Sequence, residues 1–121
     1  MDIVLNNSIS TPLYLQVYEQ IVAQIIAGTL SAHFCLPSIR NIARELDVSV
    51  ITIKNAYEML EREGYIYTIT GKGCFVAPIK YESIKTKLID EEIQRILRFC
   101  EQYNIETNEV LQTFKKYLNQ N

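Results

Sequence analysis

The sequence predicts a mainly α-helical fold that carries one small β-hairpin. Three observations support this class. Apolar residues recur every three or four positions along most of the chain, the period changes to two around the glycine-rich segment 70–73, and the helical period returns beyond Pro78. Between Leu36 and Ala77 a short helix, a tight turn, a longer helix and a hairpin are expected in succession, which is the order of a winged helix-turn-helix.

The first helix is expected to start at Thr11-Pro12, a capping residue followed by proline at the first helical position. Its apolar stripe includes Val17, Ile21 and Ile25 and continues up to Gly28, so this helix should close a three-helix core. The ten residues before it are polar and irregular in pattern, and we expect them to form a loose lead-in.

The helix-turn-helix itself is marked by capping residues. Pro37 cannot continue a preceding helix, and the Ser38 hydroxyl can accept hydrogen bonds from the amides of the next turn. The dipeptide 47–48 leaves room only for a turn, after which Ser49 can cap a third helix that Gly64 ends in a left-handed conformation. The residues expected on the buried face of that helix are Ile53, Ala56, Tyr57 and Leu60.

Beyond the hairpin two further helices are expected, separated by the break at residues 104–106, with Thr107 as the cap of the last one. Some forty residues cannot bury two apolar stripes by themselves, so they need a partner surface. A second copy of the chain is the simplest supply, and packing against the chain's own winged domain is the alternative. We therefore predict a winged domain at 1–78 and a two-helix dimerisation region at 79–121. The residues expected to face the partner copy are Ile84, Leu88, Ile93, Ile96, Leu97, Cys100, Tyr103, Val110, Leu111, Phe114, Tyr117 and Leu118.

Composition limits the remaining classes. A chain of 121 residues is one compact domain plus an appendage. Its longest apolar runs are far shorter than the ~20 residues needed to cross a bilayer, and the basic start of a signal peptide is lacking, so a cytoplasmic location is expected. The three cysteines are far apart and the single histidine, His33, lies in a predicted loop. We expect reduced thiols, with no metal site and no cofactor.

The charge balance is the main objection to nucleic-acid binding, because affinity for DNA depends largely on neutralising phosphates. The net charge is −2, and residues 1–78 contain five Lys or Arg against seven Asp or Glu. The cations Arg40, Arg44, Lys54 and Lys72 nevertheless come from the elements that a winged helix presents to DNA. With so few cations, tight binding is expected to need two copies acting together.

Three motifs follow in order: PS-x-R from residue 37, A-Y-E-x-L-E-x-E-G-x-I from residue 56 and G-K-G-x-F-V from residue 71. In this order and at this spacing the segment from Pro12 to Pro78 resembles the DNA-binding domain of GntR-family bacterial transcription regulators, and the short two-helix tail resembles the YtrA subfamily. Where many relatives have an arginine at the start of the recognition helix, this chain has Val50, followed by Ile51.

The resemblance implies that the helix from Ser49 to Glu58 enters the major groove and that the tip at 70–73 approaches the neighbouring minor groove. Val50 and Ile51 cannot hydrogen-bond a base but can contact thymine methyl groups, so a half-site rich in A·T is expected. The residues predicted to contact DNA are Ser38, Arg40, Arg44, Ser49, Val50, Ile51, Thr52, Lys54, Asn55, Thr70, Gly71, Lys72 and Gly73.

The predicted function is sequence-specific regulation of transcription by a homodimer that binds an inverted-repeat operator. The resemblance implies a repressor, and the YtrA subfamily suggests a transporter operon as its target. The tail is too short for a familiar ligand-binding fold, so any small-molecule effector would use a small pocket at the interface. The alternative is a winged helix that docks proteins without specific DNA binding. An enzyme is not expected, since the chain lacks catalytic Ser-His or Cys-His spacing and a phosphate-binding loop.

Overall fold

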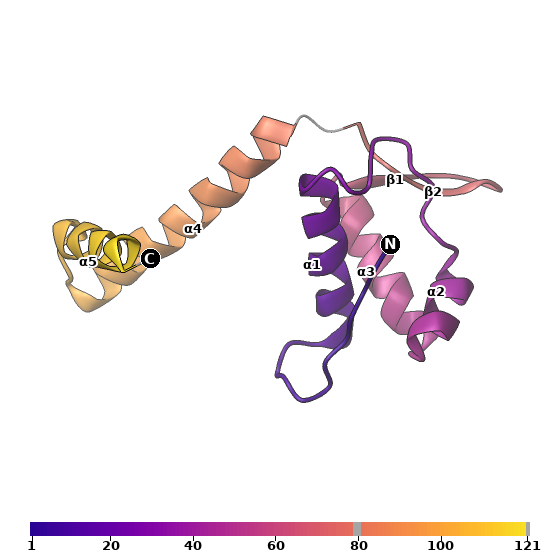
Figure 1. The fold of residues 1–121 in the computed structure, drawn as a ribbon, viewed down its shortest axis with the longest axis horizontal. Helices are drawn as coiled ribbons and strands as arrows, with labels where there is room; N and C mark the ends of the chain where they lie inside the picture. Colours follow the sequence, from indigo (N-terminus) through magenta and orange to yellow (C-terminus); the bar gives the residue numbers. More distant parts are fainter. Residues whose placement is uncertain (79–80, 121) are drawn as a thin grey trace. The chain divides into compact units, whose positions relative to one another are not determined.

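The computed structural model describes residues 1–78 and 81–120 and divides the chain into two compact units, Met1–Tyr81 and Glu82–Asn121. The predicted second region begins at residue 79, and residues 79, 80 and 121 lie outside the described part. Helices α1 (Leu13–Ile26), α2 (Ile39–Leu46) and α3 (Val50–Arg62) precede the strands β1 (Ile66–Ile69) and β2 (Gly73–Val76), and helices α4 (Tyr81–Tyr103) and α5 (Thr107–Asn119) follow (Figure 1). The predicted class, mainly helical with a small β wing, is confirmed.

In the first unit α3 is the central element, because α1, α2 and β1 all pack against it. Its buried residues are the four expected from the sequence, Ile53, Ala56, Tyr57 and Leu60. From α1, Val17 and Ile21 are fully buried, and Ile42 is the most buried residue of α2. Burial of these side chains provides the main favourable free energy for this three-helix core.

Three helices end in the same way. The residues after α2, α3 and α4 that adopt positive φ are Asp47 (54°), Gly64 (84°) and Asn104 (53°). In each case the next residue donates its amide hydrogen to a carbonyl five residues earlier, over 2.9–3.0 Å, as in a Schellman motif. The glycine was expected, whereas the aspartate and the asparagine have side chains that tolerate this conformation less well.

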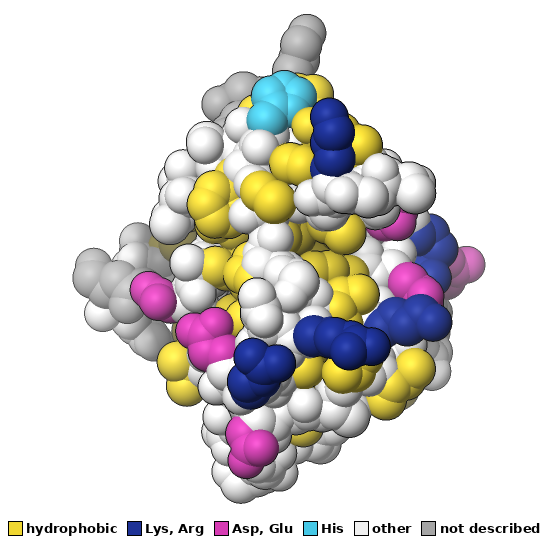
Figure 2. Space-filling model, turned by 90° about the vertical axis from the view of Figure 1, so that its right-hand side faces the viewer, with side chains coloured by type: hydrophobic (Ala, Val, Ile, Leu, Met, Phe, Trp, Pro, Cys, Tyr) yellow, Lys and Arg dark blue, Asp and Glu magenta, His cyan; other side chains and the backbone are white. Residues whose placement is uncertain are grey.

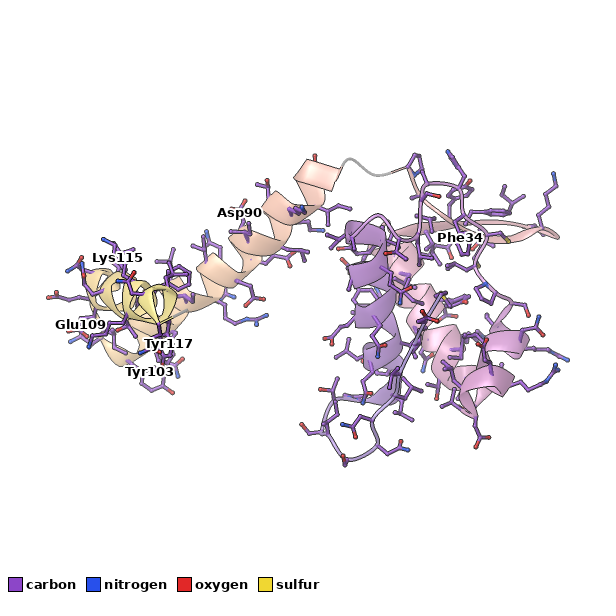
Figure 3. The ribbon with its side chains drawn as sticks, in the orientation of Figure 1. Phe34, Asp90, Tyr103, Glu109, Lys115 and Tyr117 are labelled. Carbon is purple, nitrogen blue, oxygen red and sulfur yellow. The ribbon has the colours of Figure 1, made fainter. Side chains whose placement is uncertain are left out.

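The hairpin is antiparallel, with Ile66 opposite Val76 and Tyr67 opposite Phe75. The loop before α2 adds a third, short line of pairing to it, because the amide of Leu36 donates to the Cys74 carbonyl over 2.8 Å. Phe34 lies in this loop beside the hairpin (Figure 3). The loop and the wing are therefore fixed to each other by backbone hydrogen bonds.

The lead-in is not loose, which corrects the expectation from sequence. Gln16, Gln20 and Gln24 of α1 hydrogen-bond the backbone of Asn6, Val4 and Asp2 respectively, over 2.6–3.0 Å. Two residues of an extended segment advance about 6.7 Å and four residues of a helix about 6 Å. Every second residue of the lead-in can therefore meet every fourth residue of α1. We call these residues the glutamine ladder.

Two cap predictions were wrong by one residue. Pro12, rather than Thr11, is the N-cap of α1, and its carbonyl accepts the amides of Leu15 and Gln16. Thr107 is the first residue of α5, and its N-cap Glu106 makes no side-chain capping bond. Both helices start within one residue of the expected position. Unlike α2 and α3, which are capped by serine side chains, neither has a side-chain cap.

The second unit consists of α4, the turn at Asn104 and α5. Cys100 is buried, at 4% exposure, while most of the apolar residues on both helices remain open. Tyr103 and Tyr117 are labelled on α4 and α5 in Figure 3. This unit therefore exposes most of the apolar stripes that the sequence predicted, whereas two residues expected to face a partner, Ile84 and Cys100, are already buried in the single chain.

Candidate nucleic-acid interface

The leading end of α3 is capped and exposed. Ser49 accepts a hydrogen bond from the Thr52 amide over 3.2 Å, and the two hydroxyl oxygens lie 2.8 Å apart. Val50 and Ile51, which follow the cap, are 49% and 59% exposed. This end of the helix therefore presents two branched apolar side chains to solvent, next to a pair of hydroxyls that are bonded to each other.

Two arginines of α2 stand beside this end. Arg40 and Arg44 are one helical turn apart and exposed, and neither forms an ion pair in the part of the chain that the structure describes. Together with Ala43, Val48 and Val50 they line one open hollow, which we call the α2–α3 hollow. Two unpaired guanidinium groups next to an exposed helix end can hold phosphate groups.

The wing contributes a third cation. Lys72 lies at the tip of the hairpin, where Gly71 has a φ of 80° and the Lys72 amide donates to the Ile69 carbonyl over 2.9 Å. A second hollow of about 410 Å³ has Ser38, Arg40, Lys72 and Gly73 among its lining residues, and we call it the wing hollow. Arg40 therefore belongs to both hollows and connects the wing to α3.

The rest of the exposed face of α3 is less basic. Lys54 Nζ lies 4.0 Å from Glu58 Oε1, a loose pair between two largely exposed side chains, and such pairs contribute little. Asn55 is also exposed. On the face that Figure 2 shows, several basic side chains lie next to one another in a row, with acidic groups close to both ends of the row, and a further basic side chain lies apart from them beyond hydrophobic surface. Local cations therefore offset the acidic excess of the domain only around the two hollows.

The structure thus brings together Ser38, Arg40, Arg44, Val50, Lys72 and Gly73 around the two hollows, with Ser49, Ile51 and Thr52 on the adjoining helix end. Lys54, Asn55 and Thr70 are exposed on the same elements but line neither hollow. That these residues contact DNA stays a prediction.

Sequence reasoning missed an aromatic cluster on the outer face of the wing. His33, at a φ of 69°, places its Nδ1 2.7 Å from the Tyr67 hydroxyl, and the Tyr67 ring stacks on Phe75 at 5.5 Å between centroids. The alternation of the hairpin indicates which residues share this face, but the approach of His33 depends on the non-local pairing of its loop.

Among the described residues no group of His, Cys, Asp and Glu could hold a metal ion, and no helix there is long and apolar enough to cross a membrane. All three cysteines are free thiols: Cys35 is exposed, Cys74 half-buried and Cys100 buried.

The second unit has a groove of its own. Apolar residues from both helices line an open groove of about 690 Å³, including Leu88, Ile93, Leu97, Leu111 and Phe114. All five belong to the predicted dimerisation set. The side chain of Phe114 is 59% exposed in the single chain, which is unusual for a phenylalanine that no other molecule covers.

A helix-turn-helix whose second helix has an exposed leading end and is followed by a hairpin defines a winged helix-turn-helix protein. The family model for "Bacterial regulatory proteins, gntR family" matches residues 13–76, more than half of the chain. The chain therefore belongs to the GntR family, which makes it a DNA-binding transcription regulator rather than an enzyme. The resemblance to GntR regulators of the YtrA subfamily is confirmed.

The chain is similar to the HTH-type transcriptional repressor YtrA of Bacillus subtilis (strain 168), with 31% identity over 99 residues that cover 82% of this chain and 73% of the relative. Several other curated relatives are longer, and the chain spans less than two fifths of their length. The probable rhizopine catabolism regulatory protein MocR of Rhizobium meliloti is 34% identical over 85 residues, which cover 70% of this chain but 17% of that protein.

Solved structures of transcription regulators are similar to this chain as well. A GntR family transcriptional regulator from Listeria monocytogenes superposes with a TM-score of 0.71 at 27% identity, covering 93% of this chain and 98% of that one. The DNA-binding domain of AraR in complex with operator ORX1 has a TM-score of 0.57 at 29% identity, covering 64% of this chain and 96% of that one.

Proposed function

We propose that the chain is a sequence-specific repressor that binds an inverted-repeat operator as a homodimer in the cytoplasm. Residues 1–78 are the DNA-binding domain and residues 79–121 the dimerisation region. The observation that carries this proposal is the exposed leading end of α3 with unpaired cations beside it. The similarity to the repressor YtrA supports repression as the outcome of binding.

In the proposed complex α3 lies in the major groove with its first turn toward the base edges. Arg40 and Arg44 contact phosphates on one side of the groove, and Lys72 contacts the backbone or the minor groove beside the wing. Gly71 and Gly73 carry no side chain that would hold the wing backbone away from the duplex. Binding of this kind represses transcription by occupying the operator.

The charge balance supports a dimer. Residues 1–78 carry two more acidic than basic groups, so a single domain gains little from the general field of DNA and depends on its few local contacts. Joining two domains makes the second binding event intramolecular and raises the overall affinity without new contacts. Two-fold symmetry then requires two half-sites about one helical turn apart.

The second unit offers the surface for pairing. A second copy is the proposed occupant of its groove, because a helix pair this small cannot bury both apolar stripes internally. A self-complementary apolar surface is what a two-fold interface requires. If a small-molecule effector regulates the protein, this same apolar interface is where it would bind.

The test is binding to duplex DNA that flanks the chain's own coding region, measured by fluorescence anisotropy over a range of salt concentrations and mapped by nuclease protection. Three phosphate contacts per subunit give about six per dimer, for which the slope of log K against log [salt] is about −5. A protected inverted repeat with a slope of this size is expected.

A protein-docking role of the winged helix predicts a different result. In that case no duplex is retained at low salt, and no salt-dependent binding is observed. A single protected half-site bound by one subunit would contradict the homodimer while leaving DNA binding intact.

A further inference from the structure

The first turn of α3 presents methyl groups rather than free polar groups. Val50 and Ile51 are 49% and 59% exposed, although β-branched apolar residues are usually buried. They stand directly after the cap, at the end of the helix that approaches base edges in the proposed complex. A side chain of this type can form no hydrogen bond, so any discrimination by it depends on apolar contact.

The two hydroxyl groups at this turn are bonded to each other. The hydroxyl oxygens of Ser49 and Thr52 lie 2.8 Å apart, and Ser49 also accepts the Thr52 amide over 3.2 Å. One hydroxyl hydrogen is therefore used within the protein, and reading a base with it would break a bond already made. Lys54, one turn further along the helix, makes only a loose, exposed pair with Glu58 over 4.0 Å.

The neighbouring cations favour the same orientation. Val50 lines the α2–α3 hollow together with Arg40 and Arg44, so its side chain lies next to the two groups proposed to hold phosphates. Contacts to phosphate fix the register of a helix in the groove but carry no sequence information. Val50 and Ile51, which are exposed beside these cations, can then contribute to specificity through apolar contact.

The major groove offers one apolar group that distinguishes base pairs, the C5-methyl group of thymine. We propose that Val50 and Ile51 read this methyl group, so that recognition depends on the C5 substituent of the pyrimidine and not on the hydrogen-bonding pattern of the base pair. This inference rests on the proposed function, in which α3 occupies the major groove. It further implies that 5-methylcytosine binds better than cytosine at the same position.

The experiment starts with selection of binding sites from a random duplex pool by the full chain. In the selected duplex each thymine of one half-site is then replaced by deoxyuridine, which removes the methyl group and keeps the base pair. We expect about a 4-fold loss of affinity at the one or two positions that face Val50 and Ile51, the factor that corresponds to one buried methyl-sized group. Replacement in both half-sites should give about 16-fold.

A second comparison uses cytosine and 5-methylcytosine at those positions, where the methylated base should bind about 4-fold more tightly. The variants Val50→Ala and Ile51→Ala should remove the thymine–uracil difference. Ile9→Ala, which truncates an exposed isoleucine outside α3, is the matched control and should retain it.

The two ways of failing are distinguishable. Salt-dependent binding to a half-site at which uracil and thymine bind equally would overturn the methyl inference and leave the proposed function standing. Absence of salt-dependent retention on any duplex would overturn the proposed function itself. The uracil comparison uses the unaltered protein, so its result does not depend on the folding of any variant.

Discussion

At the residue scale, Tyr57 connects α3 to the loop before α2. Its hydroxyl donates a hydrogen bond to the Pro37 carbonyl over 2.8 Å, and the residue is 4% exposed. Tyr57→Phe removes this bond while keeping the ring, so we expect a loss of about 1 kcal/mol in the free energy of unfolding. Urea denaturation measures it. Tyr14→Phe is the control, because the Tyr14 hydroxyl makes no hydrogen bond in the described part of the chain.

Tyr57 also gives a pH dependence. Burial, with smaller effects from the Cys74 and Cys35 thiols, raises the pKa of its phenol well above the ordinary value of 10.0. The folded state therefore keeps the proton when the unfolded state has lost it. The stabilisation is complete below pH 10 and declines as pH rises further. Denaturation at pH 9 and pH 11 should show a smaller decline for Tyr57→Phe than for the unaltered protein, and an equal decline would contradict this assignment.

Arg40 lines both hollows. Arg40→Ala should weaken binding to every duplex by about 1 to 3 kcal/mol and reduce the magnitude of the salt slope by about 2, one unit per subunit of the dimer. Anisotropy titrations at several salt concentrations measure both. Arg62→Ala is the control, because Arg62 lies at the far end of α3, about 18 Å from Val50. Equal effects of the two substitutions would show a general charge effect rather than a contact.

At the scale of elements, the helix ends with positive φ give a matched pair of substitutions. Asp47→Gly should stabilise the protein by about 1 kcal/mol, because glycine adopts the left-handed conformation without the cost that a Cβ imposes. Gly64→Ala should destabilise the protein by a similar amount, because alanine adopts the left-handed conformation at a cost. The added Cβ would have no atom within 4 Å, so no new contact would offset this cost. Thermal unfolding of both variants tests the pair, and shifts of the same sign would contradict it.

The same ends show what local sequence can and cannot predict. Ser38, Ser49 and Gly64 act as predicted, because a serine cap and a glycine terminator depend only on residues within one turn. The left-handed Asp47 was not predicted, since aspartate adopts this conformation less readily than glycine and nothing in the local sequence marks that it does so here. His33 was placed correctly in a loop, but its bond to Tyr67 depends on pairing between residues that are far apart in sequence.

The glutamine ladder was missed for a related reason. Polar residues at every fourth position of a helix are typical of a solvated face, and only the structure shows that the backbone of residues 2–6 hydrogen-bonds to them. Gln16 is 5% exposed, its Nε2 donates to the carbonyls of Asn6 and Thr11, and its Oε1 accepts the Asn6 amide. Both amide hydrogens and the amide oxygen of this buried side chain are hydrogen-bonded, so Gln16 stabilises the fold.

Gln16→Glu tests the ladder with almost no change in shape. The carboxylate cannot donate, so two carbonyl groups lose their hydrogen bonds and face a negative charge. We expect a destabilisation of about 2 kcal/mol and faster proteolysis within residues 1–10. Gln24→Glu, which disturbs the single bond to the Asp2 carbonyl near the end of the ladder, should have a smaller effect. Equal stability of Gln16→Glu and the unaltered protein would show that the ladder contributes nothing.

At the scale of the whole molecule, the two units differ in how much the sequence could predict. The first unit has its own core, so periodicity and caps were sufficient to predict it. The residues expected to contact DNA were predicted by resemblance and stay a prediction, but the grouping of Arg40 with both Val50 and Lys72 required the fold. In the second unit the apolar stripes were predicted correctly, and in the proposed dimer the surface that covers them would belong to a second copy, which the structure of one chain does not contain.

The proposed dimer gives the last prediction. Phe114→Glu places a charge in the apolar groove of each subunit, where it would be desolvated without a partner. We expect the dimer dissociation constant to rise about 30-fold or more, as for a central interface residue. Sedimentation velocity over a concentration series measures this. Since each separated subunit keeps only its own phosphate contacts, the salt slope of DNA binding should fall from about −5 to about −3. Gln112→Glu adds the same charge on α5 outside the groove and should leave both quantities unchanged. A Phe114→Glu protein that still sediments as a dimer would place the interface elsewhere.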